Sequence, residues 1–136
     1  MMYNFVEVNN MDEKDVEFAV KCYKKNKKKN PEYTYDQFLQ DIIDHKARRP
    51  IPHNFYDIFS LKSNSSTLWQ VLEMSMKDLV GISKLDMAKF SRRFVIPYRT
   101  LQSWCDGTNP CPIYVKLILA ELLGVYKRTI TMNVTL

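Results

Sequence analysis

The sequence predicts a mainly α-helical protein with two helical regions. Only three of its 136 residues are glycine, while 46% are hydrophobic and 26% are charged, which is typical of a folded globular chain. Apolar residues recur at intervals of three and four in several segments, which is the spacing of one helix face. Prolines and polar clusters separate these segments, as expected where helices begin and end.

The N-terminal region, residues 1–62, is predicted to be a helical module. Residues 2–8 alternate weakly in polarity and indicate either a short strand or an apolar tail. A first helix is expected from Met11 to about Lys28. Acidic residues occupy its first turn and lysines its end, where each charge suits the helix dipole. Its apolar stripe consists of Val16, Ala19, Val20 and Tyr23.

A second helix is expected to form an antiparallel pair with the first. Thr34 and Gln37 have the spacing of a capping box, in which each side chain bonds the amide of the other. Pro50 and Pro52 end this helix. The apolar stripe consists of Tyr35, Phe38, Leu39, Ile42 and Ile43.

Residues 51–61 are too apolar for a free loop, and we expect them to dock on the helical pair or to form a short helix. The next stretch, residues 62–66, contains three serines and an asparagine. Such a polar stretch predicts the boundary of the module.

The second region, residues 63–125, is predicted to contain short helices joined by tight turns. The first of them buries a stripe that begins at Leu68 and is terminated by Gly81. The next covers residues 85–94 and is introduced by residues 83–86 as a cap. Their buried side chains are expected to be Leu68, Val71, Leu72, Met76, Leu79, Met87, Phe90 and Phe94.

Pro97 predicts the start of a further helix, because proline is tolerated at the first helical position and poorly within a helix. In that helix Leu101 and Trp104 are expected to face inward as anchors. The opposite side then presents polar side chains, as does a helix that enters the major groove of DNA. These outward residues are Arg99, Gln102 and Ser103.

The stretch from Phe90 to Gly107, FSRRFVIPYRTLQSWCDG, resembles the helix-turn-helix family of the Cro/repressor type (XRE-like). The similarity extends over about residues 66–125 and also points to small helix-turn-helix proteins of Firmicutes and their phages and mobile elements. Two positions depart from the family pattern, since Val95 replaces the usual glycine and Ser91 the usual alanine. A β-branched residue resists a left-handed conformation, so the turn is expected to have an unusual geometry.

The resemblance implies a recognition helix that binds double-stranded DNA, and hence a small repressor-like regulator. The net charge of +5 agrees with an anionic partner, and most of its excess lies after residue 65. Base contacts are expected from Tyr98, Arg99, Gln102 and Ser103. Phosphate contacts are expected from Lys89, Arg92 and Arg93.

A last helix is expected to start at Pro112 and to end at Gly124, with apolar residues on nearly all sides. Because family members commonly dimerise through this helix, the resemblance implies a homodimer. Residues 126–136 form a further segment, in which 129–136 alternate strictly and predict a strand. That strand would pair with residues 2–8 or with its copy across a dimer axis.

Other functional classes find little support in the sequence. Three cysteines without paired spacing and two distant histidines argue against a metal site, and no motif for catalysis or a cofactor is present. We therefore expect no cofactor and no enzymatic activity. No apolar run reaches the roughly 20 residues of a membrane helix, so the protein is expected to be cytoplasmic. The five lysines between Lys24 and Lys29 are interpreted as a solvated helix end rather than a site.

One alternative stays open on the sequence alone. A phage-encoded inhibitor of a host defence protein, similar to some anti-CRISPR proteins, can carry a helix-turn-helix domain beside a module that blocks its target. Residues 1–62 would then contact the host protein, with their aromatic residues serving as the partner surface.

Overall fold

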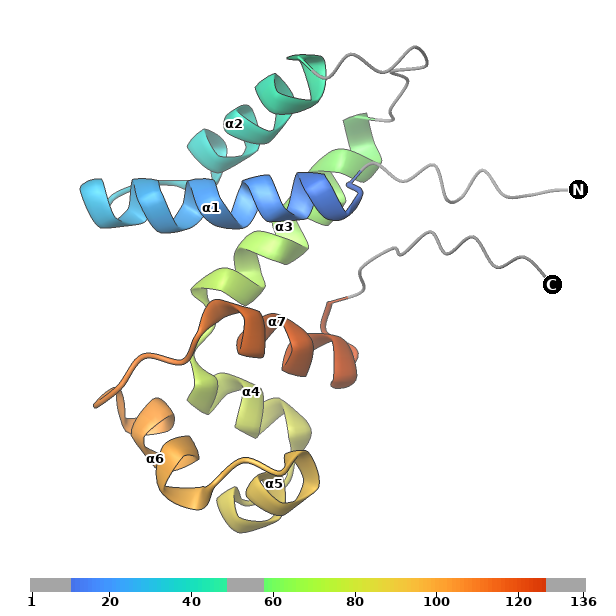
Figure 1. Cartoon of the computed structure of the whole chain (residues 1–136). Helices are drawn as coiled ribbons and strands as arrows, with labels where there is room; N and C mark the ends of the chain where they lie inside the picture. Colours follow the sequence, from blue (N-terminus) through green and yellow to red (C-terminus); the bar gives the residue numbers. More distant parts are fainter. Residues whose placement is uncertain (1–10, 49–57, 127–136) are drawn as a thin grey trace, which may run out of the picture. The chain divides into compact units, whose positions relative to one another are not determined.

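The computed structural model describes residues 11–48 and 58–126. Within these ranges the chain is mainly helical, as predicted, and has seven α-helices and no strand. The predicted strands at residues 2–8 and 129–136 lie outside the described residues, as do Pro50 and Pro52. The helices are α1 Glu13–Lys29, α2 Tyr35–Arg48, α3 Ile58–Glu73, α4 Met76–Ser83, α5 Met87–Phe94, α6 Tyr98–Asp106 and α7 Ile113–Leu122 (Figure 1).

The chain forms two compact units that divide inside α3, between Trp69 and Gln70. The polar stretch 62–66, where the boundary of the module was predicted, lies inside α3 and is helical. Leu61, Ser65 and Leu68 are all buried and follow one another at the spacing of one helix face. The Ser65 hydroxyl donates a hydrogen bond to the sulfur of Met11 at 3.6 Å. A serine can thus face a core, which the composition of the stretch concealed.

In the first unit α1 and α2 pack against each other as predicted (Figure 1). The expected capping box is confirmed, because the Thr34 amide donates to Gln37 Oε1 at 2.9 Å and the Gln37 amide donates to Thr34 Oγ1 at 3.3 Å. α1 starts with a second capping box, between Asp12 and Asp15. Each carboxylate accepts from the other's amide, which satisfies two donors that the first turn leaves free.

Asp15 also takes part in a buried ion pair between the two helices. Its side chain is 0% exposed, and its Oδ2 lies 2.7 Å from the ammonium nitrogen of Lys46 on α2. His45 Nε2 lies 3.5 Å from the other carboxylate oxygen, and the His45 ring stacks on Phe18. Because a charge buried without a partner is strongly unfavourable, the pair ties α1 and α2 to one packing arrangement.

An aromatic cluster around Trp69 joins the first part of α3 to the helical pair. The Trp69 ring centroid lies 5.2 Å from that of Phe38, and Lys27 Nζ lies 5.6 Å from the same centroid. Three tyrosines complete the cluster, in which the described rings pack on one another around Trp69. The tyrosines are Tyr23, Tyr33 and Tyr35, at 5.5, 5.9 and 6.3 Å from Trp69.

The second unit begins differently from the prediction of one helix that starts near Leu68 and ends at Gly81. α3 stops at Glu73, and α4 starts after Ser75, whose hydroxyl accepts from the Asp78 amide while Asp78 accepts from the Ser75 amide. This capping box starts a new helix. Gly81 lies inside α4, which ends at Ser83 with Lys84 in the left-handed conformation at φ 62°.

The helices after α4 follow the predictions more closely. Asp86 is the N-cap of α5, so that helix starts at Met87 rather than Leu85. Pro97 and Pro112 directly precede α6 and α7. Gly107 ends α6 and Gly124 follows α7, at φ 83° and 77°, as their predicted roles require. α4 packs against α5, α6 and α7, and α5 packs against α6.

Candidate nucleic-acid interface

The turn between α5 and α6 has a left-handed residue at Val95, with φ 55° and ψ 46°. We expected valine to force an unusual turn. Instead it adopts the conformation that glycine usually provides, and its side chain is 87% exposed. Hydrogen bonds on either side of Val95 stabilise this strained backbone conformation. The Ile96 amide donates to the Ser91 carbonyl at 2.9 Å, and the Ser91 hydroxyl donates to the Ile96 carbonyl at 2.5 Å.

The inner side of the α5–α6 pair is anchored by apolar side chains. Phe90 on α5 and Leu101 on α6 are both 0% exposed, and the Phe90 ring lies 4.7 Å from that of Phe94. Leu101 is therefore the inward anchor that the sequence predicted. Trp104, the other predicted anchor, is only half-buried, so Leu101 is the stronger constraint on the orientation of α6.

The outer side of α6 carries the predicted base-contacting residues. Tyr98 is 47% exposed, and Arg99 and Gln102 are exposed. Ser103 differs from them because it is half-buried and its hydroxyl donates to the Thr100 carbonyl at 2.8 Å. It retains only acceptor capacity for a ligand. Tyr98, Arg99 and Gln102 are the three predicted residues that α6 presents together to solvent.

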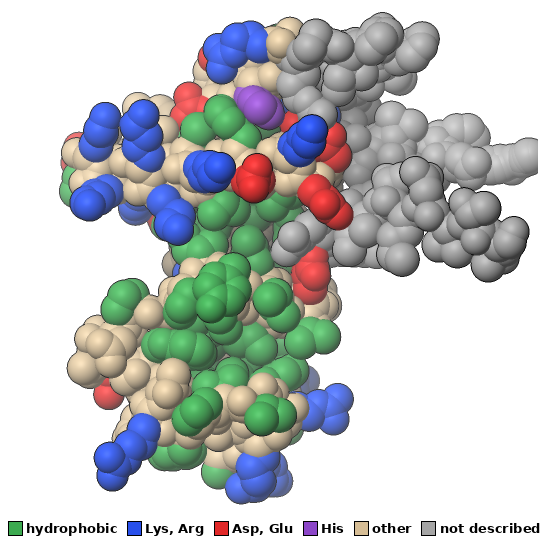
Figure 2. Space-filling model, in the orientation of Figure 1, with side chains coloured by type: hydrophobic (Ala, Val, Ile, Leu, Met, Phe, Trp, Pro, Cys, Tyr) green, Lys and Arg blue, Asp and Glu red, His purple; other side chains and the backbone are tan. Residues whose placement is uncertain are grey.

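The predicted phosphate-contacting residues lie on α5. Lys89, Arg92 and Arg93 are all exposed, and Figure 2 shows positively charged side chains at the end of the second unit that α5 and α6 form. Lys116 is a different kind of cation. It donates to the Leu72 carbonyl at 3.0 Å, and burial lowers the pKa of its ammonium group. Lys116 therefore stabilises the core of the unit instead of adding to its charged surface.

The cysteines and histidines have the environments of structural residues. Cys105 and Cys111 are half-buried free thiols, and burial raises the pKa of Cys111 to about 11. A thiol with a raised pKa is a poor nucleophile at neutral pH. His45 lies beside the Asp15 carboxylate, while the carboxylate of Asp44, the preceding residue in the sequence, accepts from Gln40. His53 lies outside the described residues.

Two absences hold for the part of the chain that the structure describes. Across 11–48 and 58–126, no group of three or more His, Cys, Asp and Glu side chains has an arrangement that would hold a metal ion. Over the same ranges, no helix combines the length and the apolar character that crossing a bilayer requires.

Comparisons with known proteins found no relative of this chain. No family model matches the sequence, and neither the curated proteins nor the solved structures contain a significant match to it.

Proposed function

We propose that this protein binds double-stranded DNA in a sequence-dependent manner through α5 and α6. The observation that carries the proposal is the orientation of α6. Leu101 is fully buried on one side, while Tyr98, Arg99 and Gln102 are exposed on the other. At 1.5 Å per residue its nine residues span about 13 Å, a length suited to the major groove.

The outward side chains suggest how bases and phosphates would be contacted. Arg99 can donate two hydrogen bonds to the major-groove edge of guanine, and Gln102 can bond adenine in the same bidentate way. Tyr98 and Ser103 would add single contacts to base edges. Lys89, Arg92 and Arg93 on α5 would hold the phosphates and fix the position of α6.

Self-association would suit this function. Tyr114 and Ile118 lie one turn apart on α7 and are 68% and 49% exposed. Exposed apolar side chains of this kind favour a second copy as their partner. A two-fold dimer would offer two α6 helices to half-sites one helical turn apart. A monomeric mass in light scattering at the concentration that saturates DNA would contradict the dimer.

The protein would then be a small transcriptional regulator of a bacterium or phage, without catalytic activity and acting in the cytoplasm. The direct test is selection from a randomised DNA duplex library with the full chain, followed by fluorescence anisotropy at several salt concentrations. We expect one enriched motif and an affinity that falls steeply with salt, as phosphate contacts require. Equal affinity for all duplexes at moderate salt would contradict sequence-dependent binding.

The matched control is Lys14→Ala in α1. Lys14 is an exposed residue of the first unit, so this change removes one positive charge without altering α5 or α6. The enriched motif and the affinity should both be retained. A loss as large as that caused by Arg92→Ala would mean that binding depends on total charge and not on the proposed surface.

A further inference from the structure

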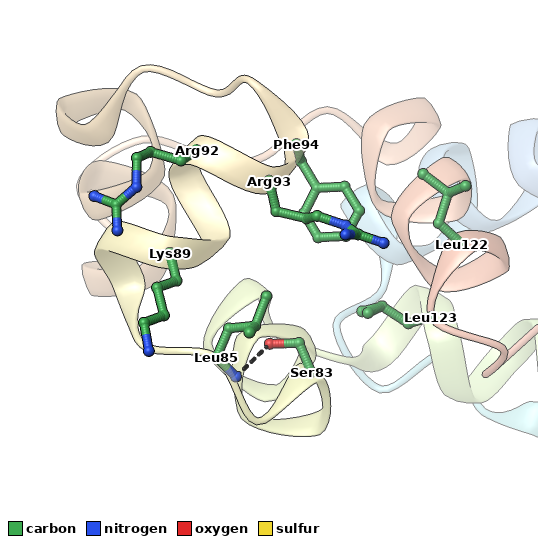
Figure 3. A pocket seen from close by; sticks show the side chains of 8 residues that line it. All are labelled: Ser83, Leu85, Lys89, Arg92, Arg93, Phe94, Leu122 and Leu123. Carbon is green, nitrogen blue, oxygen red and sulfur yellow. Dashed lines mark hydrogen bonds between the residues drawn. The ribbon is translucent and has the colours of Figure 1, made fainter.

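A groove in the second unit lies between α5 and the end of α7 (Figure 3). Its volume is about 810 Å³. In Figure 3, Leu122 and Leu123 stand on one side and Lys89 and Arg92 on the other, while Arg93 extends toward Leu122. The residues that line it are Ser83, Leu85, Lys89, Arg92, Arg93, Phe94, Leu122 and Leu123.

The groove is lined by apolar and positively charged side chains. Four of the lining residues are apolar, three are cationic and none is acidic. Leu122 offers apolar surface directly, since it is 65% exposed. The one neutral polar group is already engaged, because the Ser83 hydroxyl donates to the Val80 carbonyl and accepts from the Leu85 amide. The groove therefore offers apolar contact and positive charge but little neutral hydrogen bonding.

We infer that this groove binds a small amphipathic anion, a molecule with an apolar body and a carboxylate or phosphate head. The body would lie against Leu85, Phe94, Leu122 and Leu123, where it removes exposed apolar surface from water. The head would pair with Arg93 or with Lys89 and Arg92, whose charges no acidic lining residue offsets. The volume falls within the range of small-molecule sites, which favours such a ligand over a protein helix.

The ligand would also compete with DNA. Lys89, Arg92 and Arg93 are the residues to which the proposed function assigns phosphate contacts, and a bound anion would occupy the same charges. This consequence rests on the proposed function, whereas the binding of the anion stands on the groove alone. The groove thereby acts as an effector site that releases the protein from DNA.

The test is a titration of the ¹⁵N-labelled full chain with octanoate, followed by amide chemical shifts. Octyl phosphate replaces the carboxylate head, and octanol serves as the neutral control of equal chain length. We expect both anions to shift the amides of residues 83–94 and 122–123, with octanol at least about tenfold weaker because it forgoes the charge-assisted bonds. Shifts confined to other residues, or equal binding of octanol, would overturn the site. An acidic helical peptide that shifts these amides when octanoate does not would overturn it as well.

Two variants separate the groove from the rest of α7. Leu122→Ala should weaken octanoate binding by about fivefold through lost apolar contact, whereas Ile118→Ala should leave it unchanged. Ile118 is also an exposed apolar residue of α7 but does not line the groove, so the difference between the two variants reports the groove. Arg93→Gln should weaken octanoate about tenfold and octanol little. Equal effects of Leu122→Ala and Ile118→Ala would contradict the inference.

A final arm adds octanoate to the complex of the protein with its selected duplex. Release of the duplex is expected, with half-release at a higher octanoate concentration as the protein–DNA affinity increases. Simultaneous binding of octanoate and DNA would overturn the effector role and leave DNA binding intact. Failure to bind any duplex, with the octanoate shifts retained, would overturn the proposed function alone.

Discussion

The hydroxyl of Ser91 donates a hydrogen bond to the carbonyl oxygen of Ile96 at 2.5 Å, and the amide of Ile96 donates in return to the Ser91 carbonyl at 2.9 Å. The two residues thus hold the turn between α5 and α6 from both sides. Val95 lies between them in the left-handed conformation. The geometry that orients α6 therefore rests on a strained residue and a pair of hydrogen bonds, both of which mutation can test.

Val95→Gly should stabilise the second unit by about 1 kcal/mol. A left-handed conformation costs an L-residue roughly 1 to 2 kcal/mol, part of which the greater chain entropy of glycine offsets. Little packing is lost, because Val95 is 87% exposed. Urea unfolding and hydrogen exchange of the α5 and α6 amides measure the change. Ala88→Gly, inside α5, should have the opposite sign, and destabilisation by both substitutions would contradict the argument.

Ser91→Ala should destabilise the second unit by about 1 kcal/mol, because it removes a hydrogen bond from a nearly buried hydroxyl. The same unfolding measurement applies. Ser63→Ala is the matched control, since Ser63 is an exposed serine of α3 and should change stability by less than about 0.5 kcal/mol. An unchanged stability of Ser91→Ala would mean that the turn is held by its backbone alone.

Arg99→Ala and Arg92→Ala should affect DNA binding in different ways. Arg99→Ala should lower affinity for the selected motif about tenfold or more and relax the preference at one base pair. Arg92→Ala should weaken binding to all duplexes alike. It should also make the slope of log affinity against log salt concentration shallower, by the contribution of about one phosphate contact. Anisotropy titrations with the motif and with a scrambled duplex measure both effects. The proposed roles would be wrong if the two variants behaved identically.

Asp15→Asn should destabilise the first unit by about 3 kcal/mol, because it removes the buried carboxylate charge that lies 2.7 Å from the Lys46 ammonium group. Asparagine keeps an oxygen that can accept from the Asp12 amide, so the cap is retained and the charge is the main change. Thermal unfolding followed by circular dichroism reports the loss. The control is Asp36→Asn, an exposed position at the start of α2. We expect it to cost less than about 1 kcal/mol. Equal effects would show that burial of the pair contributes nothing.

The raised pKa of Cys111 should slow its alkylation in the folded protein. Because the pKa is raised from 9.0 to about 11, a smaller fraction of Cys111 is in the thiolate form than in the unfolded chain at any pH below about 9. Native Cys111 should therefore react with iodoacetamide at least about tenfold more slowly than in urea at pH 8. Its rate should continue to rise with pH well above 9. Peptide mass spectrometry resolves the three cysteines, and a native rate that levels off near pH 9 would contradict the shift.

The features that local sequence dictates were predicted well. The capping box of Thr34 and Gln37, the prolines before α6 and α7 and the glycines after them all depend on a few neighbouring residues. The burial of Leu101 followed from helical spacing in the same way. The box of Ser75 and Asp78 was available in the sequence too, but the apolar stripe from Leu68 onward concealed the break.

Other features were decided by contacts between distant segments. The Trp69 ring packs against aromatic rings from α1, from α2 and from the loop that joins them. Asp15 forms an ion pair with Lys46, which lies 31 positions away in the sequence. The hydrogen bonds between Ser91 and Ile96 stabilise the turn and thereby the left-handed conformation of Val95. The groove beside α5 exists only because α7 returns to it. Helix starts and ends follow from short-range hydrogen bonding, so the chain alone determines them, whereas burial, ion pairing and grooves depend on which helix faces meet in space.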